Sequence, residues 1–395
     1  YDSTTKMYVI NGSLSNRNKK EVIEVTPSLS LTKYFFKYSE VKSRSFTMQV
    51  RLMEDFKTDK NTSSFVKRNL DRSFQFFRYE GNFNYSNQLR GKYRYNASVN
   101  YAKHFEYPSI DRLYTIVDDI YAYDIRVGNP YLGNTTNHAL NMNASYNTEN
   151  PKSVYTFNVN FYGGYTLSVD PVTDSIINDI SGKRINYYVN ADRSNSKNLN
   201  YNFNISRKLN KNGIQLSYNG QFRASKTPNY IDNVSNISKT SNLSNQLSLQ
   251  FSLRSVLIIN LQQSLQHNTN RTTASQLSSF KNKSNTTKLG IVLNYPANFS
   301  LSSTIDRIGN SNVDKPILLW NTFITYRFIK QQGELKFSAM DLLKQYQNIS
   351  NYAYSYGTVT RITNGLQQYF LLTFSYYPRK FGKTDIKKQV TTREW

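Results

Sequence analysis

Long stretches of this chain alternate apolar and polar side chains at every second residue. The clearest places Tyr93, Tyr95, Ala97, Val99 and Tyr101 on one face, with an arginine, a serine and asparagines between them. Successive side chains of a β-strand point to opposite faces, so the pattern predicts a strand with one apolar and one polar face. Globular strands run about 5–6 residues, whereas tilted membrane strands need about 9–11, and this run is of the longer kind.

The composition favours a membrane wall over a dry core. Only 38% of the 395 residues are hydrophobic, and 32 tyrosines and 23 phenylalanines supply much of the apolar surface. No run approaches the ~20 apolar residues of a membrane helix, so membrane residence requires a closed barrel. A barrel with lipid outside and water inside lets half of each strand be polar. We therefore predict an all-β fold, a large antiparallel up-and-down transmembrane β-barrel with roughly 14–18 strands in this chain.

The segment 365–382 carries the same signal close to the end of the chain. When residues are taken alternately, one face is apolar and aromatic, while the other mixes apolar side chains with hydroxyl groups. The first face holds Phe370, Leu372, Phe374 and Tyr376; the second holds Leu371, Thr373, Ser375 and Tyr377. Paired tyrosines followed by Pro378, Arg379 and Lys380 suit a strand that leaves a bilayer. On this segment alone, an ordinary sandwich strand with one wet face fits as well.

Turn signals divide the chain into hairpins. Asn212-Gly213 is a strong two-residue hairpin signal, and short turns of this kind alternate with longer polar stretches, as in barrels. We predict loop character in the stretches 57–71, 105–137, 170–183, 225–240 and 268–285.

The formal net charge of +24 comes from 50 Lys and Arg against 26 Asp and Glu. Such a balance raises nucleic acid as a partner, but the positive residues are spread through strands and turns rather than gathered in one patch. Attraction to anionic lipid headgroups and a biased composition are the two competing explanations. We expect outer-membrane lipid, and not nucleic acid, to be the partner.

No constellation for catalysis is recognisable. His104, His138 and His267 lack the spacing of metal ligands, and the absence of cysteine excludes disulfide scaffolds and thiolate sites. The acids Asp118, Asp119 and Asp124 could hold a cation in an outer loop, but they suit a solvated loop better. No phosphate loop, nucleophile elbow or zinc-protease motif is present. We expect no catalytic residue, no metal, no cofactor and no enzymatic activity.

One loop carries a more specific pattern. Tyr107, Pro108, Ser109 and Ile110 are followed by Leu113, a short acidic stretch, and then Gly128, Asn129, Pro130, Tyr131 and Leu132. This pattern resembles the barrel of TonB-dependent outer-membrane receptors, and more narrowly the outer-membrane β-barrel family that often carries an N-terminal plug. The resemblance implies that the segment is an extracellular loop between two long strands.

Two segments near the other end extend the resemblance. The run from Gly333 through Asp341, Leu342 and Leu343 is similar to a family segment that precedes the last hairpin. The final strand is similar to the C-terminal signal that the barrel-assembly machinery reads, carried here by Tyr369, Phe370, Leu372, Phe374 and Tyr376. That signal normally ends the protein, whereas this chain continues through a basic tail, 383–395.

The resemblance assigns residues 1–382 to the C-terminal portion of a barrel of about 22 strands, whose plug and first strands would precede this segment. It implies TonB-dependent uptake of a siderophore, oligosaccharide or peptide across the outer membrane of a Gram-negative bacterium, with TonB engaged through the plug. Ligand contacts are expected from loop tyrosines, namely Tyr107, Tyr114, Tyr121 and Tyr123. A passive outer-membrane pore and a surface glycan-binding or adhesin β-protein are the alternatives. Because unpaired strand edges are costly in lipid, we expect this segment alone not to insert stably.

Overall fold

The computed structural model describes residues 17–64, 66–114, 124–179, 181–209, 212–254, 256–273, 279–311, 315–346, 348–354, 357–363 and 365–377. Within them the fold is almost entirely β: 19 strands form one sheet, and two more form a separate hairpin. This confirms the predicted all-β class and its long antiparallel strands. No helix among the described residues is long and apolar enough to cross a membrane.

The first half of the sheet contains β1(Asn18–Val25), β2(Ser28–Tyr38), β3(Lys42–Ser63), β4(Leu70–Leu89), β5(Tyr93–Glu106), β6(Asp124–Val127), β7(Thr135–Thr148), β8(Tyr155–Val169), β9(Val172–Asn178), β10(Arg184–Asn190) and β11(Arg193–Leu209). The second half contains β12(Asn212–Ile231), β13(Val234–Leu253), β14(Leu257–Thr272), β15(Phe280–Leu293), β16(Phe299–Asn310), β17(Ile317–Phe328), β18(Gly333–Met340) and β21(Tyr369–Tyr376). The separate hairpin is β19(Asn348–Tyr354) with β20(Gly357–Thr363), and two short helical turns are η1(Val66–Arg68) and α1(Ile110–Leu113).

The strands of the main wall follow one another as an antiparallel meander. Each of β2, β3, β4, β5, β7, β8, β11 to β18 and β21 pairs with the next in this series. Setting aside the loop strands β6, β9 and β10, and joining β1 to β2, leaves about fifteen wall strands, within the predicted range. Among the described strands, β2 pairs only with β3 and β21 only with β18, so the curved sheet has two free edges.

A proline interrupts the strand at the first of these edges. β1 and β2 both pair with β3, along its second and first halves respectively, and residues 26–27 separate them. Pro27 cannot donate to the ladder, but its carbonyl accepts a hydrogen bond from the Glu54 amide at 3.1 Å. The edge is therefore broken at Pro27 rather than continuous.

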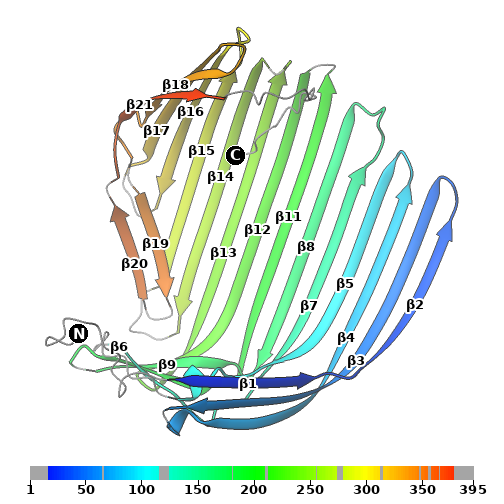
Figure 1. The fold of residues 1–395 in the computed structure, drawn as a ribbon, viewed down its shortest axis with the longest axis vertical. Coiled ribbons are helices and arrows are strands. Elements are labelled where there is room, and N and C mark those ends of the chain that lie inside the picture. Colours follow the sequence, from blue (N-terminus) through cyan, green and yellow to red (C-terminus); the bar gives the residue numbers. More distant parts are fainter. Residues whose placement is uncertain are drawn as a thin grey trace.

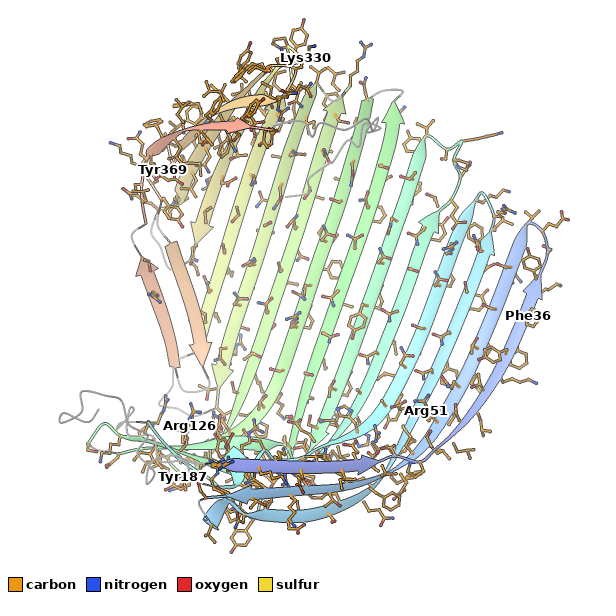
Figure 2. The ribbon with its side chains drawn as sticks, viewed as in Figure 1. Phe36, Arg51, Arg126, Tyr187, Lys330 and Tyr369 are labelled. Carbon is orange, nitrogen blue, oxygen red and sulfur yellow. The ribbon has the colours of Figure 1, made fainter. Side chains whose placement is uncertain are left out.

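The two ends of the wall differ, as Figure 1 shows. At the short-turn end the described connections are tight, for example the turn at 90–92, where the Lys92 amide donates to Leu89 O at 2.9 Å. At the long-connection end the chain adds η1, α1 and the extra strands β6, β9 and β10. There β1, the second half of β3 and the first half of β4 bend away from the wall as a three-stranded flap across that end (Figure 1). Arg51 lies close to the bend and Phe36 near the short-turn end of the free edge (Figure 2).

Three of the predicted loops are largely strand. The stretch 225–240 is a tight hairpin, because β12 and β13 stay paired up to Ile231 and Val234. The stretches 57–71 and 268–285 likewise continue β3 and β4, and β14 and β15, before a short connection. These predictions were wrong because polar residues were assigned to loops, whereas here they bond to each other. Asn236 is fully buried and donates to Asn229 Oδ1 at 2.6 Å.

The stretch 170–183 was also predicted as a plain loop, but it contains β9. β9 pairs with β10, and its Ile176 also lies beside Ile231 of the β12 tip. Both isoleucines are buried, at 2% and 7% exposure. β10 in turn pairs in parallel with β6. The long-connection end therefore carries its own small layer of strands with a local apolar contact.

The wall has one apolar and one polar face, as the alternation predicts. Following the register across the wall, one row of the apolar face is Phe157, Ile205, Leu216, Leu249, Leu261, Leu289, Ile305 and Trp320. Most of these side chains are more than a third exposed. Few large apolar residues are buried anywhere among the described residues. A wall of this kind has no dry core, and its apolar face needs a lipid-like surrounding.

Candidate functional site

The polar face is lined by amides and hydroxyls in register. One row across the middle of the wall is Ser86, Asn96, Ser145, Asn160, Asn202, Asn219, Gln246, Ser264 and Thr286. The next row is Asn84, Ser98, Asn143, Tyr162, Asn200, Gln221, Ser244, Gln266 and Ser284. Neither row contains a charged residue, so this part of the face offers many hydrogen-bonding groups without a fixed charge.

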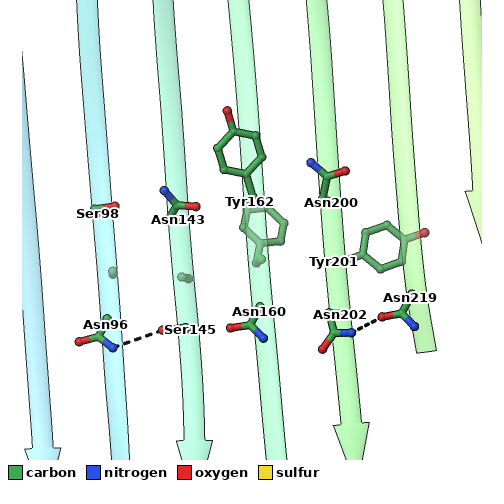
Figure 3. A pocket seen from close by; sticks show the side chains of 13 residues that line it. Asn96, Ser98, Asn143, Ser145, Asn160, Tyr162, Asn200, Tyr201, Asn202 and Asn219 are labelled. Atoms are coloured by element: carbon green, nitrogen blue, oxygen red, sulfur yellow. Dashed lines mark hydrogen bonds between the residues drawn. The ribbon is translucent and has the colours of Figure 1, made fainter. Parts of the chain in front are cut away.

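Neighbouring amides on this face bond to one another. Asn96 accepts from Ser86 Oγ at 2.8 Å and donates to Ser145 Oγ at 3.3 Å, while Asn202 donates to Asn219 (Figure 3). Because each amide carries two donors and an acceptor with two lone pairs, such pairing leaves bonding capacity for a ligand or water.

Two hollows lie against this polar lining. One, of about 500 Å³, spans the middle of β5, β7, β8, β11 and β12 and includes Asn96, Asn143 and Tyr162 (Figure 3). The other, of about 670 Å³, lies nearer the long-connection end and includes Asn198, Asn242, Asn268 and Phe280, with Arg223 contributing a positive charge. Both are large enough for a small ligand.

Gly164 makes room for this lining. A Cβ at position 164 would lie 2.4 Å from Asn198 Oδ1 and 3.0 Å from Asn141 Oδ1. The amides on either side therefore extend over the glycine, and Tyr162 donates to Asn141 Oδ1 at 2.9 Å from the same strand. A side chain at 164 would displace Asn141 and also Asn198, which lines the larger hollow.

A group of ion pairs lies where the flap meets the loop after β5. Arg78 pairs with Asp55, which also accepts from Thr26 Oγ1 at 2.9 Å. Arg72 donates to Asp59 Oδ2 at 2.8 Å and to the backbone oxygen of Pro108 at 2.8 Å. Both aspartates are only 4% exposed, so these carboxylates depend on their arginine partners.

The same region binds the loop through further contacts. Arg68 pairs with Asp111 at 2.5 Å, and the Tyr114 hydroxyl donates to Asn69 O at 3.4 Å. Within the loop, Pro108 and Leu113 are buried. The segment from Tyr107 to Tyr114 is therefore fixed on the flap rather than extended into solvent.

The Gly-Asn-Pro pattern acts as a clamp between loop segments. The Asn129 amide donates to Arg112 O at 2.8 Å, and its side chain donates to Tyr188 O of β10 at 3.0 Å. A Cβ on Gly128 would lie 2.3 Å from the backbone carbon of Tyr114, so only glycine permits this approach. Leu132 is buried, and Pro130 is exposed in the turn. Ser109 precedes α1 and accepts from the Arg112 amide at 3.0 Å.

Tyr107, one of the tyrosines predicted to contact ligand, packs inside this region. Its ring lies 4.7 Å from that of Phe74 and 5.8 Å from that of Phe76, and Lys57 Nζ is 4.3 Å from its centre. Burial, together with the carboxylates of Asp55 and Glu24, raises the pKa of the Tyr107 hydroxyl above its ordinary value. Tyr107 is a packing residue here, and Tyr114 is tied to the flap.

Tyr121 and Tyr123, together with Asp118 and Asp119, lie outside the described residues. Tyr131, in the turn after Asn129, is 92% exposed and is the more accessible aromatic group. Its exposure could not be read from the motif, because only the clamp geometry leaves this side chain outward while burying Leu132. Arg126 of β6 and Tyr187 of β10 lie at the same end (Figure 2).

The Asp341-Leu342-Leu343 segment forms the turn that follows β18. Asp341 is 5% exposed; its carboxylate accepts from the amides of Gln345 and Tyr346, each at 2.9 Å. The Leu342 amide donates to Trp320 O at 2.9 Å, whereas Leu343 is 41% exposed. Asp341 therefore has a structural role, because its carboxylate holds this turn.

The final strand lies at the second free edge of the wall. In β21, Tyr369 pairs with Met340 and Tyr376 with Gly333 across β18. Its apolar face is open, and the exposed fractions of its side chains exceed one half. These are Phe370 at 54%, Leu372 at 69%, Phe374 at 63% and Tyr376 at 53%. The residues 378–395, including the basic tail, lie outside the described residues.

The described residues contain no group of three or more His, Asp or Glu side chains placed to hold a metal ion. His138 instead bonds to the Tyr101 hydroxyl at 2.7 Å.

No family model and no curated protein matches this sequence. Among solved structures, FpvA of P. aeruginosa, bound to pyoverdines, is 8% identical, with a TM-score of 0.30 and coverage of 92% of this chain and 64% of FpvA. The siderophore receptor PirA from Acinetobacter baumannii is 10% identical, with a TM-score of 0.34 and coverage of 90% and 59%. The outer membrane transporter YddB from Escherichia coli is 7% identical, with a TM-score of 0.28 and coverage of 82% and 50%.

This chain therefore spans about three fifths of FpvA and of PirA, and half of YddB. At these identities and TM-scores the likeness carries no argument about what the chain binds or transports. The molecule's own features define its class: an antiparallel β-wall with an apolar face, an amide-lined face and a capped end.

Proposed function

We propose that this chain is part of the barrel wall of an outer-membrane transporter that takes up a ligand from outside a Gram-negative cell. The observation that carries the proposal is the chemistry of the two faces. An exposed apolar and aromatic face lies opposite an amide-lined face along strands of up to 20 residues. Strands of this length and alternation suit a wall between lipid and water.

The capped end supports a receptor rather than an open pore. In outer-membrane barrels the short turns face the periplasm and the longer connections face outward. The flap and the clamped loop then lie on the outer side, where Arg72 joins them through Asp59 and the oxygen of Pro108. A fixed outer layer of this kind can position binding groups over the entrance, whereas an open pore needs none. Energy supply through TonB belongs to this proposal.

The lining favours a neutral ligand with many hydrogen-bonding groups. The two central rows are uncharged, and the charged residues that line the larger hollow are Arg223 and Lys197. Aromatic groups at hand are Tyr162 and Phe280 in the hollow and the exposed Tyr131 at the outer end. An oligosaccharide or a peptide matches amides and aromatic rings better than a strongly anionic ligand does.

The test uses the full-length protein in its native membrane. Membrane fractionation should place it in the outer membrane, and detergent should be needed to extract it. Cells that lack the gene should lose uptake of a candidate oligosaccharide or peptide. Cells that keep the gene but have their TonB-type energy supply blocked should lose uptake to the same extent. Extraction by buffer alone would refute the membrane wall. Uptake that persists without the energy supply would refute energy-driven transport and would support a passive pore.

A further inference from the structure

A band of cations crosses the apolar side of the wall toward its long-connection end. Lys226 of β12 lies directly opposite Lys239 of β13, and Lys239 lies directly opposite Arg271 of β14. All three side chains are exposed. By the two-residue alternation they share a face with the exposed Leu247 and Leu265. Lys197, Lys281 and Lys283 continue this basic band on β11 and β15.

Like charges directly opposite each other in a sheet are destabilising, so this arrangement needs compensation. Nothing in the band supplies it. Asp306 is the one acidic residue in the described strands β11 to β16. It lies opposite Lys288, on the polar side of the wall. An external anion is therefore the natural partner of the basic band.

The band lies where lipid headgroups would be. On β12 the apolar face runs from Ile214 through Tyr218 to Phe222, about 27 Å along the strand. At a tilt of about 40° this covers about 21 Å of membrane, close to the ~25 Å apolar band of such barrels. Lys226 follows four residues later, about 10 Å further along the membrane normal, beyond the hydrocarbon.

A hollow lies between the apolar part of this face and the basic band. About 570 Å³ in volume, it is lined mainly from the apolar side by Leu243, Leu265, His267, Lys283 and Gly309. Gly309 of β16 carries no side chain and leaves space in its lining. An apolar floor with a cation at its margin fits an acyl chain whose headgroup is anionic.

We infer that the basic band and this hollow bind a phosphorylated lipid of the outer leaflet, such as a bisphosphorylated glycolipid. Its phosphates lie against Lys226, Lys239 and Arg271, and an acyl chain enters the hollow beside Leu243 and Leu265. The inference rests on the proposed membrane wall but not on the identity of the transported ligand. Bound phosphates offset the repulsion among the three cations and so stabilise the wall on that side.

The experiment uses the full-length protein in nanodiscs of phosphatidylcholine that contain a small fraction of lipid A, either bisphosphorylated or enzymatically dephosphorylated. Bound lipid A is counted by mass spectrometry after mild detergent extraction. The test variant replaces Lys226, Lys239 and Arg271 with Gln. The matched control replaces Lys37, Lys92 and Lys152 with Gln, three exposed lysines near the short-turn end.

An interfacial cation contributes about fivefold to binding of an anionic lipid, so the triple variant should lose affinity for the phosphorylated lipid on the order of 100-fold. The control variant should bind phosphorylated lipid A as tightly as the unmodified protein does. Dephosphorylated lipid A should bind weakly to the unmodified protein, the test variant and the control variant. Lys239→Glu should raise the thermal midpoint in lipid without phosphate, because the new carboxylate lies between Lys226 and Arg271, and should abolish further stabilisation by lipid A.

Equal binding of phosphorylated and dephosphorylated lipid, or equal loss in the test and control variants, would overturn the inference while leaving the membrane wall intact. Failure of the full-length protein to enter nanodiscs of any composition would overturn both.

Discussion

The contact most easily tested is the one that ties the outer loop to the flap. Arg72 is 16% exposed and Asp59 6% in their side chains; Arg72 donates to Asp59 Oδ2 and to Pro108 O. The Arg72→Met change leaves the buried carboxylate with Lys20, whose Nζ is 3.8 Å away and half exposed. Breaking a buried pair from one side costs about 3–5 kcal/mol, because one charge stays buried without its partner.

If about 3 kcal/mol of this cost falls on local opening, the open population of the loop rises on the order of 100-fold. Trypsin cleavage after Arg112, measured by mass spectrometry on the full-length protein in detergent, should accelerate by that factor. Adding Asp59→Asn removes the unpaired charge and should bring the rate back to within about tenfold of the original. Arg90→Met, an exposed arginine at the short-turn end, is the control. Equal cleavage in Arg72→Met and the control would refute the role of Arg72 in fixing the loop to the flap.

The close approach at Gly128 predicts that Gly128→Ala, whose Cβ would lie 2.3 Å from the backbone of Tyr114, opens the turn. Hydrogen exchange at the Asn129 amide should then speed up by about tenfold or more, and an unchanged rate would argue against the clamp. The pKa of the Tyr107 hydroxyl is raised above the ordinary 10.0. Subtracting the tyrosinate absorbance of Tyr107→Phe from that of the unmodified protein during a pH titration should therefore give a curve with its midpoint above pH 10.0. Since the neutral form is favoured in the folded state, this contribution to stability is complete below about pH 10 and lost as pH rises through the folded pKa. Trp320, 38% exposed on the apolar side, should be quenched by brominated lipid. The quenchable signal should vanish in Trp320→Phe, and its persistence there would contradict this placement.

The alternation in the sequence predicted the wall strands because it reports directly which residues lie on the apolar face and which on the polar face. It fails where both faces are polar. Beyond the apolar band the tip of β12 and β13 reads as loop, yet Asn229 and Asn236 bond there in a fully paired ladder. Intrinsic strand preference is low for such residues, and cross-strand bonding overrides it.

The ion pairs of the flap were missed for a related reason. Asp59 and Arg72 are direct partners across β3 and β4, so a hairpin extended to Asn61 and Leu70 would have brought them together. The sequence contained the signal, but the assignment of 57–71 to a loop hid it. The bend that carries the flap away from the wall coincides with a break in the pattern, because Met53 and Glu54 reverse the apolar alternation of β3 and residues 57–63 are all polar.

The motif residues show how a family-like pattern can be recognised without its role being known. Gly128, Asn129 and Asp341 were singled out as a pattern, and each has a structural role in the backbone of its loop. Gly128 permits the close approach of the Tyr114 backbone, and Asn129 donates two hydrogen bonds, one from its backbone and one from its side chain. The Asp341 carboxylate accepts hydrogen bonds from the amides that hold the turn after β18. Gly128 and Asn129 fix the loop at the long-connection end, and Asp341 fixes the turn after β18. The groups left free to meet a ligand are then the less distinctive ones, namely Tyr131 and the amides of the polar face. A ligand screen should therefore begin with variants of these groups rather than with the motif, whose changes would alter loop structure and binding together.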